Sequence, residues 1–214
     1  MPRPDLSHIL PEQKLVVIAQ YQKLAEEDSA HYSPLQCAAY NETSPENARL
    51  AVLILIEHYE SQGEAVLKEA LSYAGGDFGE HILHIAMKYP DIFMDCCDAL
   101  ERVSLLEELL LRPDGEGDTV MHQLVEYGRL ESFQRLVQDP NRADLMSKAL
   151  EEVNHHSESA NDLLDNFEKT VTIQFLLANN HGYLAQFERV KAVLPEMRAA
   201  IEENLAGLRR SFSY

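Results

Sequence analysis

Apolar residues recur at helical spacing along most of this chain. Near the N-terminus they stand at i, i+4, i+7 and i+8, which predicts a leading helix over about residues 11–27. These positions are Val17, Tyr21, Leu24 and Ala25. Between Ala48 and Tyr59 apolar residues cover several faces of a helix, which is typical of a helix buried between neighbours. We therefore expect an all-α protein.

The same spacing places the other helices. Thr43 and Glu46 stand at capping-box spacing before the buried helix, which begins near Pro45. One apolar stripe from Ile92 to Leu110 predicts a single helix of five turns that Pro113 ends.

Towards the C-terminus the elements become shorter. Apolar residues from Met146 to Val153 predict an extra helix, and the polar stretch 154–162 predicts a loop. A last amphipathic helix is expected after Pro195. Its apolar residues are Met197, Ile201, Leu205 and Leu208.

The stretch 114–128, DGEGDTVMHQLVEYG, sets turn and capping residues at fixed offsets. Gly117 suits a tight turn, Thr119 can accept a hydrogen bond from a helix's first amides, and Gly128 suits the left-handed position past a helix end. Together with Asp114 and His122, the pattern resembles an ankyrin repeat. The family has Pro-Leu where this chain has Val120 and Met121, and a small residue where it has Leu124.

Decayed copies of this pattern occur at 33–42, 76–90 and 173–182. Their capping positions, with Thr119, are Ser33, His81 and Ile173, so the intervals are 48, 38 and 54 residues, against about 33 for the family. The resemblance implies an ankyrin-like helical repeat solenoid with capping helices at both ends. An unrelated stack of helix pairs would show similar periodicity without the histidine and glycine matches.

The implied boundaries follow the copies. Residues 1–30 form an N-terminal capping helix, and 31–194 form four divergent repeats, at about 31–74, 75–112, 113–153 and 163–194. Residues 195–214 form a C-terminal capping helix and tail.

The resemblance also implies a binding surface. In ankyrin-like stacks the two residues before the terminating glycine, and the turn tips, face a concave surface. The selected residues are Tyr40, Lys88, Tyr89, Glu126, Tyr127 and His181, with Phe78, Glu116 and Asp118 at the tips. We expect them to bind a protein partner, because tyrosine offers apolar area with a polar tip. Alternatively, each tyrosine ring covers its neighbour's helix end, and Phe78 folds inward.

Charge and composition narrow the partner. With 36 acidic and 18 basic residues, the net charge of −18 opposes binding to nucleic acid and anionic membranes. It favours a protein with a basic or mixed face, although such charge can also serve solubility alone. No apolar run reaches the roughly 20 residues that span a bilayer, and the N-terminus lacks a signal peptide's apolar core. Three cysteines form no disulfide framework, which fits a reducing, cytoplasmic compartment.

Candidate chemistry is sparse. His81 and His84 form an H-x-x-H pair, and His155 and His156 have acidic neighbours, so a metal site can be drawn. No nucleophile or phosphate-binding motif accompanies them. We expect a non-enzymatic adaptor or inhibitor that needs no cofactor and is monomeric when unbound. The alternative is a small all-α metal-dependent hydrolase or modifying enzyme with converging histidines.

The C-terminus carries a second resemblance. Glu196, Glu202 and Glu203, with Phe212 third from the end, look like the glutamate-rich tails of bacterial effectors delivered by Dot/Icm type IV secretion. This similarity implies delivery into a host cell's cytoplasm. An ordinary amphipathic end helix also places glutamates on its wet face.

Overall fold

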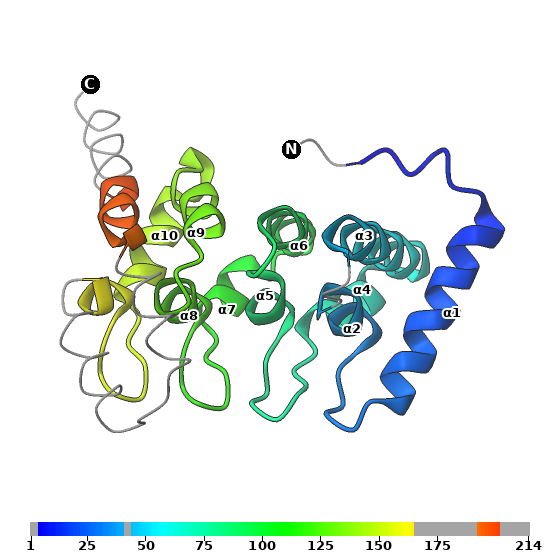
Figure 1. Cartoon of the computed structure of the whole chain (residues 1–214), viewed down its shortest axis with the longest axis horizontal. Coiled ribbons are helices and arrows are strands. Elements are labelled where there is room, and N and C mark those ends of the chain that lie inside the picture. Colours follow the sequence, from blue (N-terminus) through cyan, green and yellow to red (C-terminus); the bar gives the residue numbers. More distant parts are fainter. Residues whose placement is uncertain (1–3, 41–43, 165–191, 202–214) are drawn as a thin grey trace. The chain divides into compact units, whose positions relative to one another are not determined.

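The computed structural model describes residues 4–40, 44–164 and 192–201, and within these ranges the protein is all-α (Figure 1). Two isolated β-bridges, Gly75 with Glu80 and Val153 with Ser159, accompany the helices. The chain divides into two compact units, Met1–Gly115 and Glu116–Tyr214. In the described ranges, every helix is too short or too polar to cross a membrane.

The first unit arranges its helices in pairs. In Figure 1, α2 and α5 lie side by side in one layer and α3 and α6 in the next, and α1 packs against both α2 and α3. The elements are α1 (Pro11–Glu27), α2 (Pro34–Tyr40), α3 (Pro45–Gln62), α4 (Glu64–Ser72), α5 (Ile82–Ala86), α6 (Pro90–Arg102) and α7 (Leu106–Leu111).

The core of the first unit is centred on α3. Its residues 51–56 are all buried, and Phe93 of α6 is fully buried beside this layer. A buried Leu, Ile or Phe side chain contributes about 1.5–3 kcal/mol relative to an exposed one. The expectation of a helix that is buried on several faces is therefore confirmed.

A buried ion pair joins α3 to α6. The Arg49 guanidinium donates from Nε to Asp95 Oδ2 at 2.6 Å and from Nη2 to Asp95 Oδ1 at 3.2 Å. Asp91 adds an ion pair to Nη1 at 3.2 Å. Both Arg49 and Asp95 are less than a tenth exposed, and the hydrogen bond to Asp95 raises the pKa of Arg49.

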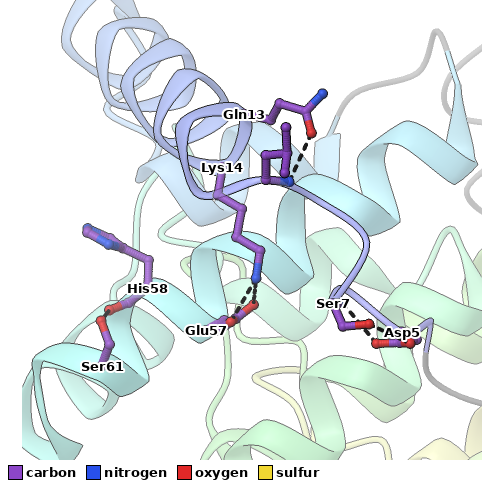
Figure 2. A network of polar contacts seen from close by, with 8 residues as sticks. Asp5, Ser7, Gln13, Lys14, Glu57, His58 and Ser61 are labelled. Atoms are coloured by element: carbon purple, nitrogen blue, oxygen red, sulfur yellow. Dashed lines mark hydrogen bonds and ion pairs between the residues drawn. The ribbon is translucent and has the colours of Figure 1, made fainter.

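Polar contacts fix the start of α1 and hold α1 against α3 (Figure 2). Lys14 of α1 donates to both carboxylate oxygens of Glu57 on α3, each at 2.8 Å. Gln13 accepts the backbone N–H of Leu10 at 3.0 Å, so a side chain satisfies a free amide at the helix start.

The leading helix has the predicted bounds, but its buried face differs from the prediction. Ile18 and Tyr21 are buried, whereas Leu24 is 43% exposed. At the start of α3 the capping residue is Ser44, whose Oγ accepts the Asn47 N–H at 3.3 Å, and not Thr43.

The long helix predicted from Ile92 to Leu110 is wrong, because the chain turns at Ser104. Ser104 adopts a left-handed φ of 58°, and Leu105 N donates to the Leu100 carbonyl at 2.9 Å. Ser104 N donates to the Glu101 carbonyl at 3.0 Å, which completes a Schellman motif. The apolar stripe continues into α7, so periodicity alone does not reveal the break.

The second unit contains α8 (Val120–Glu126), α9 (Leu130–Val137), the 3₁₀ turn η1 (Pro140–Arg142) and α10 (Ala143–Glu151). Residues 160–164 and 192–201 are also helical. α9 packs against both α8 and α10, and Phe133 and Met197 are fully buried. The extra helix predicted around Met146 is confirmed as α10.

Gly128 confirms the predicted helix end. Its φ is 59°, and Arg129 N donates to the Leu124 carbonyl at 2.9 Å. The loop predicted over 154–162 is shorter than expected, because helical structure already begins at Ala160. The helix expected after Pro195 begins earlier, since residues 192–194 are helical. The copy at 173–182, with Ile173 and His181, and the positions Leu205 and Leu208 lie outside the described residues.

Candidate functional site

Besides the start of α1, where Gln13 accepts the Leu10 N–H, four described helix starts share one capping geometry. In each, the side chain of the third helical residue accepts the backbone N–H of the capping residue. The four bonds are Ser33 N to Gln36 Oε1 at 2.8 Å, His81 N to His84 Nδ1 at 3.4 Å, Thr119 N to His122 Nδ1 at 3.2 Å, and Ser159 N to Asp162 Oδ2 at 2.9 Å. These side chains therefore build the scaffold.

Two of these side chains reach onward to the next capped turn. In the first unit Gln36 Nε2 donates to the Glu80 carbonyl at 2.6 Å, and in the second unit His122 Nε2 lies 2.8 Å from the Glu158 carbonyl. Because His122 Nδ1 accepts an N–H, its proton sits on Nε2 and is donated to that carbonyl. Both carbonyls belong to the residue just before the next cap.

The fourth capped start is Ser159, which the repeat pattern does not identify; Ile173, the capping position that the pattern predicts, lies outside the described residues. Ser159 Oγ accepts the Asp162 N–H at 3.1 Å and donates to Asp162 Oδ2 at 2.7 Å. A signal was present, since Ser159 and Asp162 stand at capping-box spacing.

His81 also serves the scaffold. It is fully buried at the start of α5, and its Nδ1 accepts the Leu83 N–H at 3.3 Å. Burial, with His84 nearby, holds the pKa of His81 well below its usual range, so the ring is neutral.

A groove of about 700 Å³ opens between α1 and α2 in the first unit. We call it the tyrosine groove; it is lined by Tyr21, Leu24, Glu27, Asp28, Tyr32, Cys37 and Tyr40. Its volume lies within the range of about 300–1,000 Å³ typical of ligand pockets.

Aromatic rings shape this groove. Tyr32 and Tyr40 stack with their ring centroids 5.9 Å apart and their planes 21° from parallel. Tyr40 is 56% exposed, while Tyr21 is buried. With the half-exposed Leu24, the groove presents apolar and aromatic surface to solvent instead of packing it into the core.

Polar groups fix the groove's wall. Asp28 accepts the backbone N–H groups of Ala30 at 3.2 Å and Tyr32 at 2.9 Å, which orders the loop after α1. The Tyr32 hydroxyl donates to Glu80 Oε2 at 3.0 Å. Burial, then the Glu80 charge, raises the pKa of Tyr32, so this hydroxyl stays protonated. Burial likewise raises the pKa of the Cys37 thiol.

The loop that carries Tyr32 rests on the loop between α4 and α5, and both project on the same side of the unit (Figure 1). Gly76 N donates to the Ala30 carbonyl at 2.8 Å, and the Tyr73 hydroxyl donates to the His31 carbonyl at 2.9 Å. A Cβ at Gly76 would come within 2.6 Å of the Tyr32 ring. Glycine here therefore lets the two loops close around Tyr32.

The predicted partner-binding residues have different environments. Tyr40 lines the groove, and Phe78 is 50% exposed instead of folding inward. Lys88 lies over the ring of Tyr89, with Nζ 5.6 Å from the centroid, and both are partly buried.

The predicted residues of the second unit also differ from one another. Tyr127 is partly buried beneath Arg129, whose Cζ lies 6.0 Å from the ring centroid. Glu126 is partly buried and Glu116 is exposed. Asp118 accepts Asn154 Nδ2 at 2.8 Å, so it supports the turn.

The candidate metal residues do not form a cluster within the described ranges. His155 and His156 are exposed neighbours whose rings lie 3.8 Å apart. Among residues 4–40, 44–164 and 192–201, no group of three or more His, Cys, Asp or Glu side chains is placed to hold a metal ion.

No protein-family model, curated protein or solved structure matches this chain significantly. We therefore infer function from the residues described above.

Proposed function

We propose that this chain is a non-enzymatic protein-interaction module, an adaptor or inhibitor, built on an ankyrin-like stack of capped helix pairs. The recurring cap supports the stack. Gln36 ties its turn to Glu80 as His122 ties its turn to Glu158, one bond within each unit. Such links between successive turns are what a repeat needs, because a single helix pair cannot bury its own apolar face.

The tyrosine groove carries the proposal of binding. Tyr40 and Leu24 expose apolar surface beside a loop that several hydrogen bonds hold in place. A rigid site loses less entropy on binding than a mobile one, and tyrosine is enriched among residues that dominate interface energies. The net charge of −18 favours a partner with a basic face.

Photocrosslinking tests this proposal. A photoreactive residue at Tyr40 should capture a protein that the same residue at Gln22 does not. Gln22 is also exposed, but it lies on nearly the opposite side of α1 from Leu24, because two residues rotate by about 200° around a helix. The captured protein is then purified and titrated against the wild-type chain and the Tyr40→Ala and Leu24→Ala variants.

Two results would decide the matter. Support requires that Tyr40→Ala or Leu24→Ala weakens the titrated affinity about tenfold while the fold persists, as expected for a residue at the centre of an interface. If the doubly substituted chain binds the purified protein with wild-type affinity, the groove is not the docking surface.

Two further hypotheses from the sequence have their own tests; the first extends this proposal, and the second is the alternative to it. Delivery by a type IV system predicts that removal of residues 195–214 abolishes translocation in a reporter assay. The metal-dependent hydrolase predicts that the purified chain retains a stoichiometric metal, which elemental analysis measures.

A further inference from the structure

We propose that the tyrosine groove accepts an arginine side chain from a basic, extended peptide segment of the partner. This inference rests on the proposed function and specifies the chemistry of its ligand. Three features of the groove support it, namely its size, its aromatic faces and its charge.

The size and openness of the groove favour a ligand that consists of one side chain and a short length of its peptide backbone. A groove of about 700 Å³ exceeds the volume of one side chain and fits a short peptide. It is bounded on one side by α1, through Tyr21 and Leu24, and on the other by α2, through Cys37 and Tyr40. A peptide can therefore lie across the groove and direct one long side chain into it.

The aromatic faces suit a cation. Tyr40 lines the groove, is 56% exposed and stacks its ring on Tyr32, so much of the Tyr40 side chain is accessible to a ligand. A guanidinium over a tyrosine face is attracted by the ring's negative quadrupole. Tyr32 remains neutral because its pKa is raised, and its hydroxyl is already directed at Glu80.

The charge at the groove is negative. Glu27 and Asp28 both line it, and Glu80 adjoins Tyr32. None of the described residues that line the groove is Lys or Arg. The nearby cation Lys23 forms an exposed pair with Glu27 at 3.6 Å, which is a weak surface contact that a ligand can displace.

These features favour arginine over other occupants. An apolar helix would take the carboxylates of Glu27 and Asp28 out of water and offer them no cation, at a cost in free energy. Arginine combines a planar group that stacks on rings with paired donors for carboxylates, whereas lysine presents a compact charge.

A peptide titration tests the inference. The probes are acetylated Gly-Ala-Arg-Ala-Gly and its versions with lysine, citrulline or norleucine at the centre, followed by chemical-shift changes in the full chain. The arginine peptide should bind most tightly, and the citrulline and norleucine peptides should bind about tenfold or more weakly, since they lose the hydrogen bonds between a cation and the carboxylates. Raised salt should weaken the arginine peptide.

Variants locate the site. Tyr40→Ala should weaken arginine-peptide binding about 5- to 30-fold, and Tyr40→Phe should preserve most of it, because the ring face remains. Leu15→Ala is the matched control, since it removes an exposed apolar side chain of α1 outside the groove and should change nothing.

Cys37 gives an independent readout. It is partly exposed in the groove, whereas Cys96 and Cys97 are fully buried. Because its pKa is raised, maleimide labelling is followed at about pH 9. The arginine peptide should slow the labelling of Cys37, and the citrulline peptide should not.

The outcomes separate this inference from the proposed function. Equal binding of arginine and citrulline peptides, equal binding of arginine and lysine peptides, or wild-type binding by Tyr40→Ala would overturn the arginine assignment. The groove's role in protein binding would still stand if Tyr40→Ala weakens the crosslinked partner. Conversely, tight arginine-peptide binding without any captured protein would support the arginine assignment and contradict the role in protein binding.

Discussion

His122 and Glu158 are joined by a hydrogen bond of 2.8 Å from the imidazole Nε2 to the backbone carbonyl. Gln36 makes the equivalent bond to Glu80 at 2.6 Å. An amide and an imidazole thus perform one task, because each offers an acceptor for its own capping N–H and a donor for the next turn.

This equivalence predicts that His122→Gln is tolerated and His122→Leu is not. The leucine variant leaves the buried Thr119 N–H and the Glu158 carbonyl without their side-chain partner, which should lower the free energy of unfolding by about 1–3 kcal/mol. Urea denaturation measures both variants. A glutamine variant as unstable as the leucine variant would contradict the equivalence.

The buried pair of Arg49 and Asp95 gives a second prediction. Asp95→Leu leaves the guanidinium with only Asp91, so the free energy of unfolding should fall by about 3 kcal/mol or more. The double variant Arg49→Met with Asp95→Leu removes both charges and should recover most of this loss, as thermal and urea unfolding would show.

The control is the more exposed pair of Arg102 and Glu60, which also joins α6 to α3. Glu60→Ala should cost no more than about 1 kcal/mol, because solvent already screens this pair. A loss at Glu60 as large as that at Asp95 would show that burial does not set the cost of these contacts.

Local signals in the sequence located several helix starts. Pro11, Pro34 and Pro45 each stand at the first helical position that proline favours, so α1, α2 and α3 begin where their residues predict. The repeat pattern does not identify Ser159, because the copy at 173–182 matches the pattern at leucine and alanine positions. The serine and aspartate of its capping box carry the signal instead.

The tyrosine groove could not be predicted from spacing. Leu24 continues the apolar stripe of α1, so periodicity assigns it to the core, yet it faces the groove because Ile18 and Tyr21 make the contact with the unit. Tyr32 comes from a loop whose path depends on Asp28 and on close approach to Gly76. Such tertiary contacts leave no period in the sequence.

Ser104 gives a third prediction. Its φ of 58° matches that of Gly128, which closes the same motif after α8. A side chain in this conformation raises the free energy of the folded state by about 1–2 kcal/mol, and glycine removes this strain. Part of the gain is offset, because glycine makes the unfolded chain more flexible. Ser104→Gly should therefore stabilise the chain by roughly 0.5–1 kcal/mol. Urea denaturation measures the change, and a loss of stability would show that the serine side chain makes a compensating contact.

His81 predicts an acid-dependent stability. Burial lowers its folded-state pKa well below the value of about 6.5 expected in the unfolded chain. Below that pH the imidazole is protonated in the unfolded state but not in the folded state. The free energy of unfolding therefore falls as the pH falls, by up to about 1.4 kcal/mol per pH unit. The His81→Thr variant introduces the residue found at the equivalent capping position, Thr119, and so removes the titrating imidazole. The variant's unfolding free energy should therefore change less steeply than the wild type's between about pH 6 and pH 5.

The wild type and the His81→Thr variant also supply the control. Above about pH 8 the imidazole is neutral in both states, so any remaining difference reports the packing of threonine beside His84 and Arg112 and not titration. Subtracting this pH-independent difference in unfolding free energy leaves the contribution of His81 protonation. Parallel stability curves for the two proteins across the acidic range would mean that His81 has the same pKa in the folded and unfolded states, and its role as a neutral, buried cap of α5 would then be wrong.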